Sequence, residues 1–159
     1  DQAAAFTREL ADVYRYVLES RKNELVKLEE ELKFLDSFLY LYRLRFDQKL
    51  IVNIEIESKL NQFCIPPLTL QMLIENAVKH NIVSQKKPLH IDVKSEGNYI
   101  LIRNNMQLKI TESYSSKVGL SNIKNRFKYL TDSSVEIITN ENYFEVKIPL
   151  IDRNECINN

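Results

Sequence analysis

Residues 66–81, PPLTLQMLIENAVKHN, carry an apolar and a polar helical face in one short stretch. The two prolines suit the first turn of a helix, where a missing N–H donor costs nothing, so we expect the helix to begin near Pro67. Apolar residues at steps of three and four predict a buried stripe made of Leu70, Leu73, Ile74 and Ala77. The stretch therefore predicts a helix with one face on a core and another free for polar contacts.

The polar face of this helix holds Asn76, Lys79 and His80 at i, i+3 and i+4, with Glu75 at its edge. An amide oxygen can bind a magnesium ion, and an ammonium group three residues later can meet the phosphates that the ion bridges. From these residues alone, an ordinary surface helix that carries an Asn and a Lys is the leading interpretation. A magnesium and phosphate site is the alternative.

The composition limits the classes of function. With 159 residues, the chain can form one ordinary core, or a compact domain of about 100 residues with an appendage. Lys+Arg and Asp+Glu are equal at 22 each, so we expect no nucleic-acid partner. No apolar run approaches the roughly 20 residues of a membrane span, which predicts a soluble chain. Cys64 and Cys156 lack metal-type spacing and are expected to be free thiols in a reducing compartment.

The first third of the chain reads as helical. Residues 3–19 predict an amphipathic helix, and the polar residues 20–23 predict a break, with a continuous helix as the alternative. The apolar residues that follow alternate steps of three and four, as in the seam of a coiled coil or helical bundle: Leu25, Leu28, Leu32, Leu35, Leu39, Tyr42 and Phe46. This seam predicts a helical partner. Phe34, Phe38 and Leu41 widen the stripe and support the alternative, a helix packed on its own domain.

The apolar period then changes to two, which is the period of a strand with one buried face. The predicted elements after residue 46 are a strand at 52–57, the helix at 66–81, strands at 89–94 and 99–103, a loop at 105–118, a helix at 119–130, and strands at 135–139 and 143–148. This order predicts an α+β fold, a mixed sheet with its helices on one face. We expect a helical segment at 1–46, a sheet domain at 47–152 and a tail at 153–159.

Three motifs carry a resemblance to a known family. The run LQMLIENAVKHN at 70–81 closely resembles the N box of the LytS-type sensor histidine kinases, whose pattern reads roughly LQPLVENAIKHG. Residues 28–46 resemble the helix that precedes the ATPase domain of that family, and GLSNIKNRFKYL at 119–130 resembles its second glycine box and following helix. The resemblance implies a Bergerat-type (GHKL) two-layer α/β sandwich that binds ATP between the N-box helix and a mobile lid.

The resemblance also implies roles for the N-box residues. Asn76 would coordinate Mg²⁺, Lys79 would meet the phosphates, and Glu75 and His80 would line the pocket. The loop at 105–118 would be the lid.

The second glycine box would contribute further contacts with the nucleotide. Gly119 would let its backbone close over the phosphates beside a helix N-terminus, with Leu120 next to it. Asn122 and Arg126 lie one turn apart on the helix that follows. Packing on the helix surface is the leading interpretation for these two residues, and phosphate contact is the alternative.

The sequence departs from the family pattern in both glycine boxes. The first box usually reads Asp-x-Gly-x-Gly, with the Asp accepting a hydrogen bond from the adenine amino group, whereas this chain reads Asn104-Asn105-Met106-Gln107-Leu108. An Asn carbonyl can accept that hydrogen bond but lacks the charge that would strengthen it. Lys117 stands where the family often has Gly, and it could itself reach a phosphate.

The phosphoryl acceptor of such kinases is a His on the dimerisation helices. The two histidines of this chain are His80, inside the N box, and His90, expected on the solvent side of a strand, so neither matches the acceptor by position. Since the chain does not start with Met, we expect a fragment that begins after the acceptor, and a protein that lacks an acceptor is the alternative.

The resemblance implies the ATP-binding catalytic portion of a two-component protein-histidine kinase. ATP and Mg²⁺ would serve to phosphorylate an upstream His, and the phosphoryl group would pass to an Asp of a response regulator receiver domain. The implied assembly is a homodimer through the helical segment, within the cytoplasmic part of a bacterial sensor that reaches the membrane only through upstream segments. The alternative is a nucleotide-independent pseudokinase that acts as a dimeric interaction module. An ATPase of the related chaperone and mismatch-repair group would explain the fold but not the heptad helix.

Overall fold

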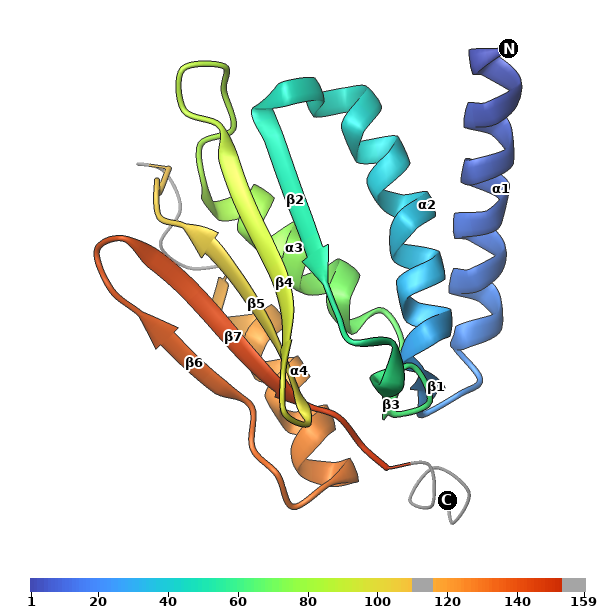
Figure 1. Cartoon of the computed structure of the whole chain (residues 1–159), viewed down its shortest axis with the longest axis vertical. Helices are drawn as coiled ribbons and strands as arrows, with labels where there is room; N and C mark the ends of the chain where they lie inside the picture. Colours follow the sequence, from blue (N-terminus) through green and yellow to red (C-terminus); the bar gives the residue numbers. More distant parts are fainter. Residues whose placement is uncertain (110–115, 153–159) are drawn as a thin grey trace.

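The computed structural model describes residues 1–109 and 116–152 of the chain (Figure 1). Two helices come first, and a five-stranded sheet with two further helices follows. The elements are α1 (Gln2–Ser20), β1 (Val26–Lys27), α2 (Leu28–Phe46), η1 (Asp47–Lys49), β2 (Leu50–Glu55), η2 (Ser58–Leu60), β3 (Cys64–Ile65), α3 (Thr69–His80), β4 (Leu89–Glu96), β5 (Tyr99–Asn105), α4 (Ser116–Leu130), β6 (Glu136–Thr139) and β7 (Tyr143–Pro149).

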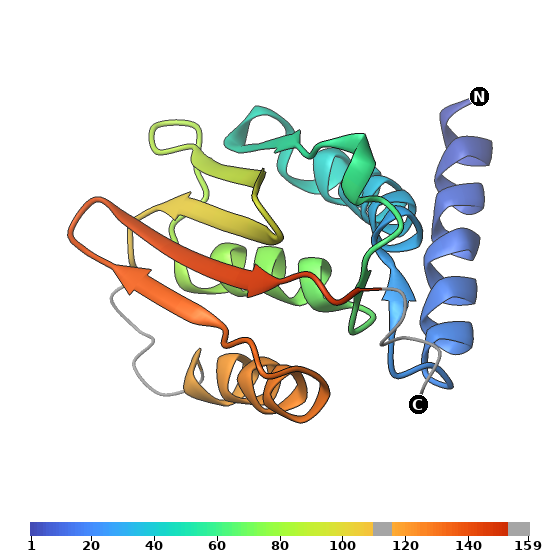
Figure 2. The same cartoon turned by 60° about the horizontal axis from the view of Figure 1, so that its bottom comes forward.

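The five-stranded sheet has the order β2-β4-β5-β7-β6. Strands β2 and β4 are parallel, and the other neighbours are antiparallel. Gly97 forms the β4–β5 turn with a φ of 57°, a conformation that glycine adopts without strain. Helices α3 and α4 lie on the same side of the sheet in both views (Figures 1 and 2). The predicted α+β fold, with a mixed sheet and helices on one face, is confirmed.

The crossover from β2 to the parallel strand β4 places α3 against the sheet. Parallel neighbours need such a crossover, and a helix is the usual way to make it. The sheet residues that face the helices are buried: Leu89, Ile91, Val93, Ile100, Ile102, Val146 and Ile148. The predicted helix stripe of Leu70, Leu73, Ile74 and Ala77 is buried against them. His90, on the other face of β4, is exposed as predicted.

The helix pair at the start of the chain packs onto the same core. The predicted break at residues 20–23 is confirmed, since α1 ends at Ser20. Helix α1 lies along α2, so the chain itself supplies a helical partner (Figure 1). The buried residues Phe34, Phe38 and Leu39 of α2 belong to the core of the sheet, as the alternative interpretation held. The boundary expected at residue 46 stays a prediction.

Three expected element boundaries are wrong. Leu25 lies before α2 rather than in a heptad seam, because β1 pairs with β3 immediately after it. Helix α3 begins at Thr69 instead of near Pro67, because Leu68 adopts a left-handed conformation with a φ of 66°. Helix α4 begins at Ser116, so Gly119 lies inside the helix instead of opening it. None of the described helices is both long and apolar enough to cross a membrane.

The short strand β3 also corrects the expectation for the cysteines. Cys64 is disulfide-bonded, so the prediction of two free thiols is wrong at this position. Its backbone N–H donates to the carbonyl of Ile151 at 2.8 Å, and the Ile151 N–H donates back to Cys64 at 2.9 Å. The backbone pair of Cys64 and Ile151 joins distant parts of the chain. The spacing of the cysteines along the sequence does not reveal such a contact. Cys156 and the predicted tail lie outside the described residues.

Candidate functional site

The polar face of α3 borders two cavities that share Asn76. Asn76 and His80 line one cavity, whereas Glu75, Asn76 and Lys79 line the other. The sequence therefore identifies the right helix face, but the structure divides that face between two spaces. The Asn76 side chain stands at their junction.

Asn76 itself lies under α4. An added Cβ on Gly119 would be 3.3 Å from Asn76 Nδ2 and 3.4 Å from its Oδ1, so the absence of a side chain at residue 119 allows this close approach. The Nδ2 atom is buried and has no hydrogen-bond partner among the described residues. A buried amide group without a partner costs free energy, and a bound ligand can supply the missing contact.

The first cavity has a volume of about 200 Å³ and is enclosed by α3, α4, β5 and β7. Because alternate residues of a strand share a face, Asn104 points to the same side as the buried Ile102. Its Nδ2 donates to the carbonyl of Asn105 at 2.8 Å. The main apolar lining consists of Ala77, Met106, Leu108, Leu120 and Phe144. An apolar space with a few amide groups suits a flat, partly polar ligand.

The second cavity, of about 560 Å³, lies between α2 and α3 and carries excess positive charge. Three cationic side chains line it, namely Arg45, Lys79 and Lys109, and Glu75 is the carboxylate among its lining residues. Such a surface attracts anions, and phosphate groups in particular.

Glu75 has a neighbour on α2. The hydroxyl of Tyr42 donates to Glu75 Oε1 at 3.5 Å. Burial, together with the negative charge of Glu75, raises the pKa of Tyr42 to about 12. The neutral phenol is therefore retained at ordinary pH and can keep this link between the two helices.

Residues 106–109 form a strap across the C-terminal end of α3. The N–H of Gln107 donates to Asn81 Oδ1 at 2.9 Å, and the N–H of Ile82 donates to the Gln107 carbonyl at 2.8 Å. The Lys109 Nζ donates to the carbonyl of Lys79 at 2.8 Å, where a cation also suits the negative end of the helix dipole. The predicted bounds of the loop at 105–118 are wrong at both ends, because Asn105 still belongs to β5 and α4 already begins at Ser116. Residues 110–115 of the predicted lid lie outside the described residues.

The remaining predicted site residues lie elsewhere. Asn105 accepts the His90 N–H at 2.8 Å and so belongs to the contact between β4 and β5. Asn122 is exposed on α4 and lines neither cavity. Arg126 donates to the carbonyl of Pro67 at 3.3 Å, near the start of α3. Lys117 is in the first turn of α4, and its side chain is not among those described.

Several lining residues were missed from the sequence. In the sequence, Tyr42 belongs to the apolar stripe of a helix and Arg45 lies beside that stripe. Lys109 belongs to a predicted loop, and Phe144 belongs to a predicted strand. Their types alone carry no signal, since aromatic and basic residues occur on most surfaces. The excess of basic side chains at Arg45, Lys79 and Lys109 becomes visible only when α2, α3 and the strap come together.

The described residues contain no cluster of three or more His, Cys, Asp or Glu side chains that could hold a metal ion. Mg²⁺ does not require one, because it commonly binds through one or two protein oxygens together with phosphates and water. The amide of Asn76, with Glu75 beside it, fits that kind of site. A half-turn of the amide would exchange its oxygen and nitrogen, so either atom can face the cavity.

Sequence comparisons match both the start of the chain and a longer stretch. A family model described as "Histidine kinase" matches residues 1–50. The sensor histidine kinase/phosphatase LytS of Staphylococcus aureus strain Mu50 is 31% identical over 93 residues, which are 58% of this chain and 16% of LytS. The chain thus covers a small part of the curated relatives it matches.

Solved structures with the same fold include several histidine kinases. The cytoplasmic segment of histidine kinase QseC has a TM-score of 0.57 and 21% identity, over 81% of this chain and 78% of that chain. The catalytic domain of histidine kinase ThkA has a TM-score of 0.52 and 13% identity, over 81% and 97%. Acinetobacter baumannii histidine kinase AdeS has a TM-score of 0.51 and 13% identity, over 91% and 76%. Together the comparisons show that the chain shares its fold with histidine kinase structures and part of its sequence with LytS and with the histidine kinase model.

Proposed function

We propose that this chain is the ATP-binding catalytic portion of a two-component sensor histidine kinase. The observation that carries the proposal is the position of Asn76, whose buried amide nitrogen has no partner among the described residues and lies where an apolar cavity meets a cationic one. A nucleotide has the same division, with a flat base at one end and phosphates at the other. The fold shared with the histidine kinase catalytic domain of ThkA supports the proposal.

In this proposal the adenine base occupies the apolar cavity. The Asn104 amide donates to the Asn105 carbonyl through Nδ2, and this hydrogen bond does not use its carboxamide oxygen. The carboxamide oxygen can then accept from the adenine amino group, as an Asp does in related kinases. His80 lines the same cavity, and Leu120 contributes an apolar contact.

The phosphates would lie toward Lys79, with Arg45 and Lys109 completing the positive surface. Asn76 would hold Mg²⁺ together with phosphate oxygens, and Glu75 could add a carboxylate. Gly119 lets α4 approach this point. Bound ATP supplies the phosphoryl group, and the chain's own residues fix its position and offset its charge.

The proposed substrate is a His upstream of this chain in the intact kinase. The phosphoryl group would then pass to an Asp of a response regulator receiver domain. We further propose a homodimer through the helical segment 1–46, with the ATP-binding domain at 47–152. A bacterial sensor anchored to the membrane by its upstream part, with this portion in the cytoplasm, would fit these roles.

Titration of the chain with a fluorescent ATP analogue, with and without Mg²⁺, tests the proposal. We expect Mg²⁺-dependent binding, and we expect Asn76→Ala to weaken it roughly tenfold to a hundredfold, the effect of one lost contact to a charged group. Asn125→Ala, at an exposed residue of α4, is the matched control. No binding by the unaltered chain, or equal binding by Asn76→Ala, would contradict the proposal.

The strap favours a second candidate, a nucleotide-independent interaction module. Residues 106–109 lack both glycines of the family pattern. They are also hydrogen-bonded to the C-terminal end of α3. A pseudokinase binds no nucleotide and therefore does not need residues 106–109 to move. Limited proteolysis discriminates the two candidates, because ATP should protect residues 105–118 from cleavage in a kinase and leave the cleavage rate unchanged in a pseudokinase.

A further inference from the structure

Helix α3 has no capping side chain of its own. A helix leaves its first backbone N–H groups without intrahelical partners, and a Ser, Thr, Asp or Asn before the first turn usually accepts from one of them. Here the residue before α3 is Leu68, which makes no side-chain cap and adopts a left-handed conformation that is unfavourable in a residue with a Cβ. Another part of the chain must satisfy these donors.

Glu31 of α2 satisfies them. Its Oε2 accepts from the Leu68 N–H at 3.0 Å, and its Oε1 accepts from the Leu70 N–H at 3.1 Å. The side chain is fully buried, with 0% exposure. A carboxylate in this position also meets the positive end of the α3 dipole. The helix that carries Asn76 is thus capped by a different helix.

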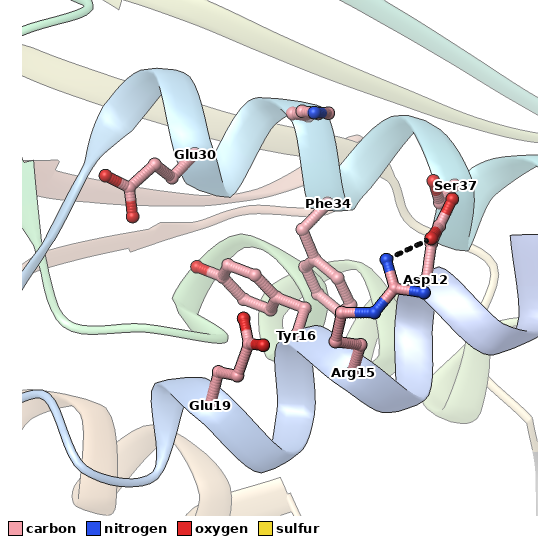
Figure 3. A pocket seen from close by; sticks show the side chains of 8 residues that line it. Asp12, Arg15, Tyr16, Glu19, Glu30, Phe34 and Ser37 are labelled. Carbon is pink, nitrogen blue, oxygen red and sulfur yellow. Dashed lines mark hydrogen bonds and ion pairs between the residues drawn. The ribbon is translucent and has the colours of Figure 1, made fainter.

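Tyr16 of α1 connects a third helix to the same carboxylate. Its hydroxyl donates to Glu31 Oε2 at 2.7 Å, and its ring stacks on Phe34 with centroids 4.3 Å apart. Figure 3 shows the Tyr16 and Phe34 rings side by side in a cavity of about 300 Å³ between α1 and α2. Contacts therefore run from Tyr16 to Glu31 and on to the first turn of α3.

A second contact joins α2 to α3 next to the site. Tyr42 donates to Glu75, and Glu75 directly precedes Asn76. Helix α2 thus holds α3 at its beginning and again beside the candidate magnesium ligand.

A buried carboxylate is a costly way to cap a helix. Burial raises the pKa of Glu31, although the hydrogen bonds from Tyr16, Leu68 and Leu70 favour the charged form. A Ser or Asp at residue 68 could cap the helix locally, without a buried charge. What the Glu31 arrangement adds is a dependence of α3 on the position of α2 and, through Tyr16, of α1.

We propose that Glu31, held by Tyr16, is a positioning residue that sets the nucleotide affinity of the site by fixing the helix that carries Asn76. This inference rests on the proposed function and deepens it. Displacement of α1 along α2 would break the Tyr16 contact, loosen the first turn of α3 and shift Asn76. The α1–α2 pair would then control ATP binding without touching the nucleotide.

Two variants test the positioning role, and both retain most of the packing. Tyr16→Phe removes one hydroxyl and keeps the stacked ring. Glu31→Gln removes the charge and places the amide N–H₂ group next to the hydroxyl and N–H groups that donate to Glu31. Tyr14→Phe makes the same change at a tyrosine that is 63% exposed on α1. Arg103→Ala, on the face of the sheet that the helices leave uncovered, breaks the pair with Glu145, lowers stability without touching α3 and controls for global destabilisation.

Two readouts separate this inference from the proposed function. The first is amide hydrogen exchange at residues 68–72, measured where all variants are folded. We expect faster exchange there in Tyr16→Phe and Glu31→Gln, and unchanged exchange in both controls. The second is affinity for the fluorescent ATP analogue, which should fall by about twofold to tenfold in Tyr16→Phe, the effect of one hydrogen bond, and further in Glu31→Gln.

Each outcome decides one of the two proposals. Unchanged exchange at residues 68–72 overturns the positioning role, whatever the nucleotide does. Faster exchange with unchanged analogue affinity also overturns the positioning role, because the cap would then stabilise α3 without affecting nucleotide binding. If the unaltered chain binds no analogue but exchange rises as expected, Glu31 does position α3 and the proposed function fails.

Discussion

Gly119 of α4 lies against the Asn76 amide on the polar face of α3. The absent Cβ at Gly119 leaves space for the Asn76 amide, whose atoms lie 3.3–3.4 Å from where that Cβ would be. The glycine does not have a positive φ, so its importance is this approach and not a special backbone conformation. Residue 119 therefore affects the site because it leaves empty the space that a methyl group would occupy.

Gly119→Ala should separate stability from binding. Ala favours a helix by about 1 kcal/mol over Gly, and this gain offsets the tight contact with Asn76, so we expect the free energy of unfolding to change by less than about 1 kcal/mol. The displaced amide should weaken binding of the ATP analogue by about tenfold. Chemical denaturation and analogue titration measure the two effects, with Asn125→Ala as the control in the same helix. Full affinity in Gly119→Ala would show that the amide position is unimportant.

Tyr42 should make stability fall at alkaline pH. Its pKa is raised in the folded chain to about 12, from 10.0, chiefly by burial and next by the charge of Glu75. Because the folded state holds the proton more tightly, the stabilising contribution is complete below pH 10.0 and is lost as pH rises toward about 12. Tyr42→Phe has no hydroxyl to titrate and therefore lacks this pH-dependent contribution to stability.

Urea denaturation at about pH 9 and about pH 11 measures the Tyr42 effect. The free energy of unfolding should drop more between the two pH values in the unaltered chain than in Tyr42→Phe. Tyr129→Phe, at a residue 84% exposed on α4, should behave like the unaltered chain. Equal drops in all three proteins would contradict the prediction.

Among the elements, α3 is controlled at both ends by other parts of the chain. Glu31 of α2 caps its first turn, and Lys109 of the strap meets the carbonyls of Val78 and Lys79 at its last turn. The local sequence supplies no side-chain cap at the first turn, whereas at the last turn Asn81 Nδ2 also donates to the Ala77 carbonyl at 2.9 Å. The orientation of Asn76 is therefore a property of α2, α3 and the strap together.

Strands β5 and β7 depend on a pair on the uncovered face of the sheet. Arg103 Nε donates to Glu145 Oε2 at 2.6 Å, and Glu145 is only 4% exposed although it lies on that face. Its carboxylate is shielded by the Arg103 side chain, whose guanidinium also lies 4.3 Å from the Tyr143 ring centroid. Removal of Arg103 would leave a carboxylate in poor contact with both water and a partner.

Arg103→Ala should lower the free energy of unfolding by about 1–2 kcal/mol, the cost of an unpaired, partly shielded carboxylate. Lys94→Ala, on the same face, breaks an exposed pair with Glu55 at 3.5 Å and should cost less than about 0.5 kcal/mol. Thermal or chemical denaturation of both variants checks the difference. Equal losses would mean that the burial of Glu145 is unimportant.

In the whole molecule, one face of the five-stranded sheet is covered by helices and the candidate site lies within that helical layer. Both views show α3 and α4 on this side, with α2 beyond α3 and α1 at the edge of the molecule (Figures 1 and 2). The cavities occur where α3 meets α2 and where it meets α4. Any movement of the helices relative to the sheet would therefore change the site before it changed the sheet.

The sequence predicts well what depends on local pattern. The period of two at Leu89, Ile91 and Val93 identifies a half-buried strand, and the steps of three and four around Asn76 identify the helix and its polar face. It fails where distant groups act on each other. A two-residue strand such as β1 has no period, and the cap from Glu31 lies far from α3 in the sequence.

The amino-acid order alone thus determined the order of the longer helices and strands, the α+β architecture and the helix face that carries Asn76, because hydrophobic periodicity depends on neighbouring residues. Tertiary structure alone decided where α3 begins, why residue 119 is a glycine, and which cations from α2 and the strap gather near Lys79. These features arise from distances between residues far apart in the chain. The stretch 66–81 contains the groups of the candidate site, but α2, α4 and the strap give them their positions.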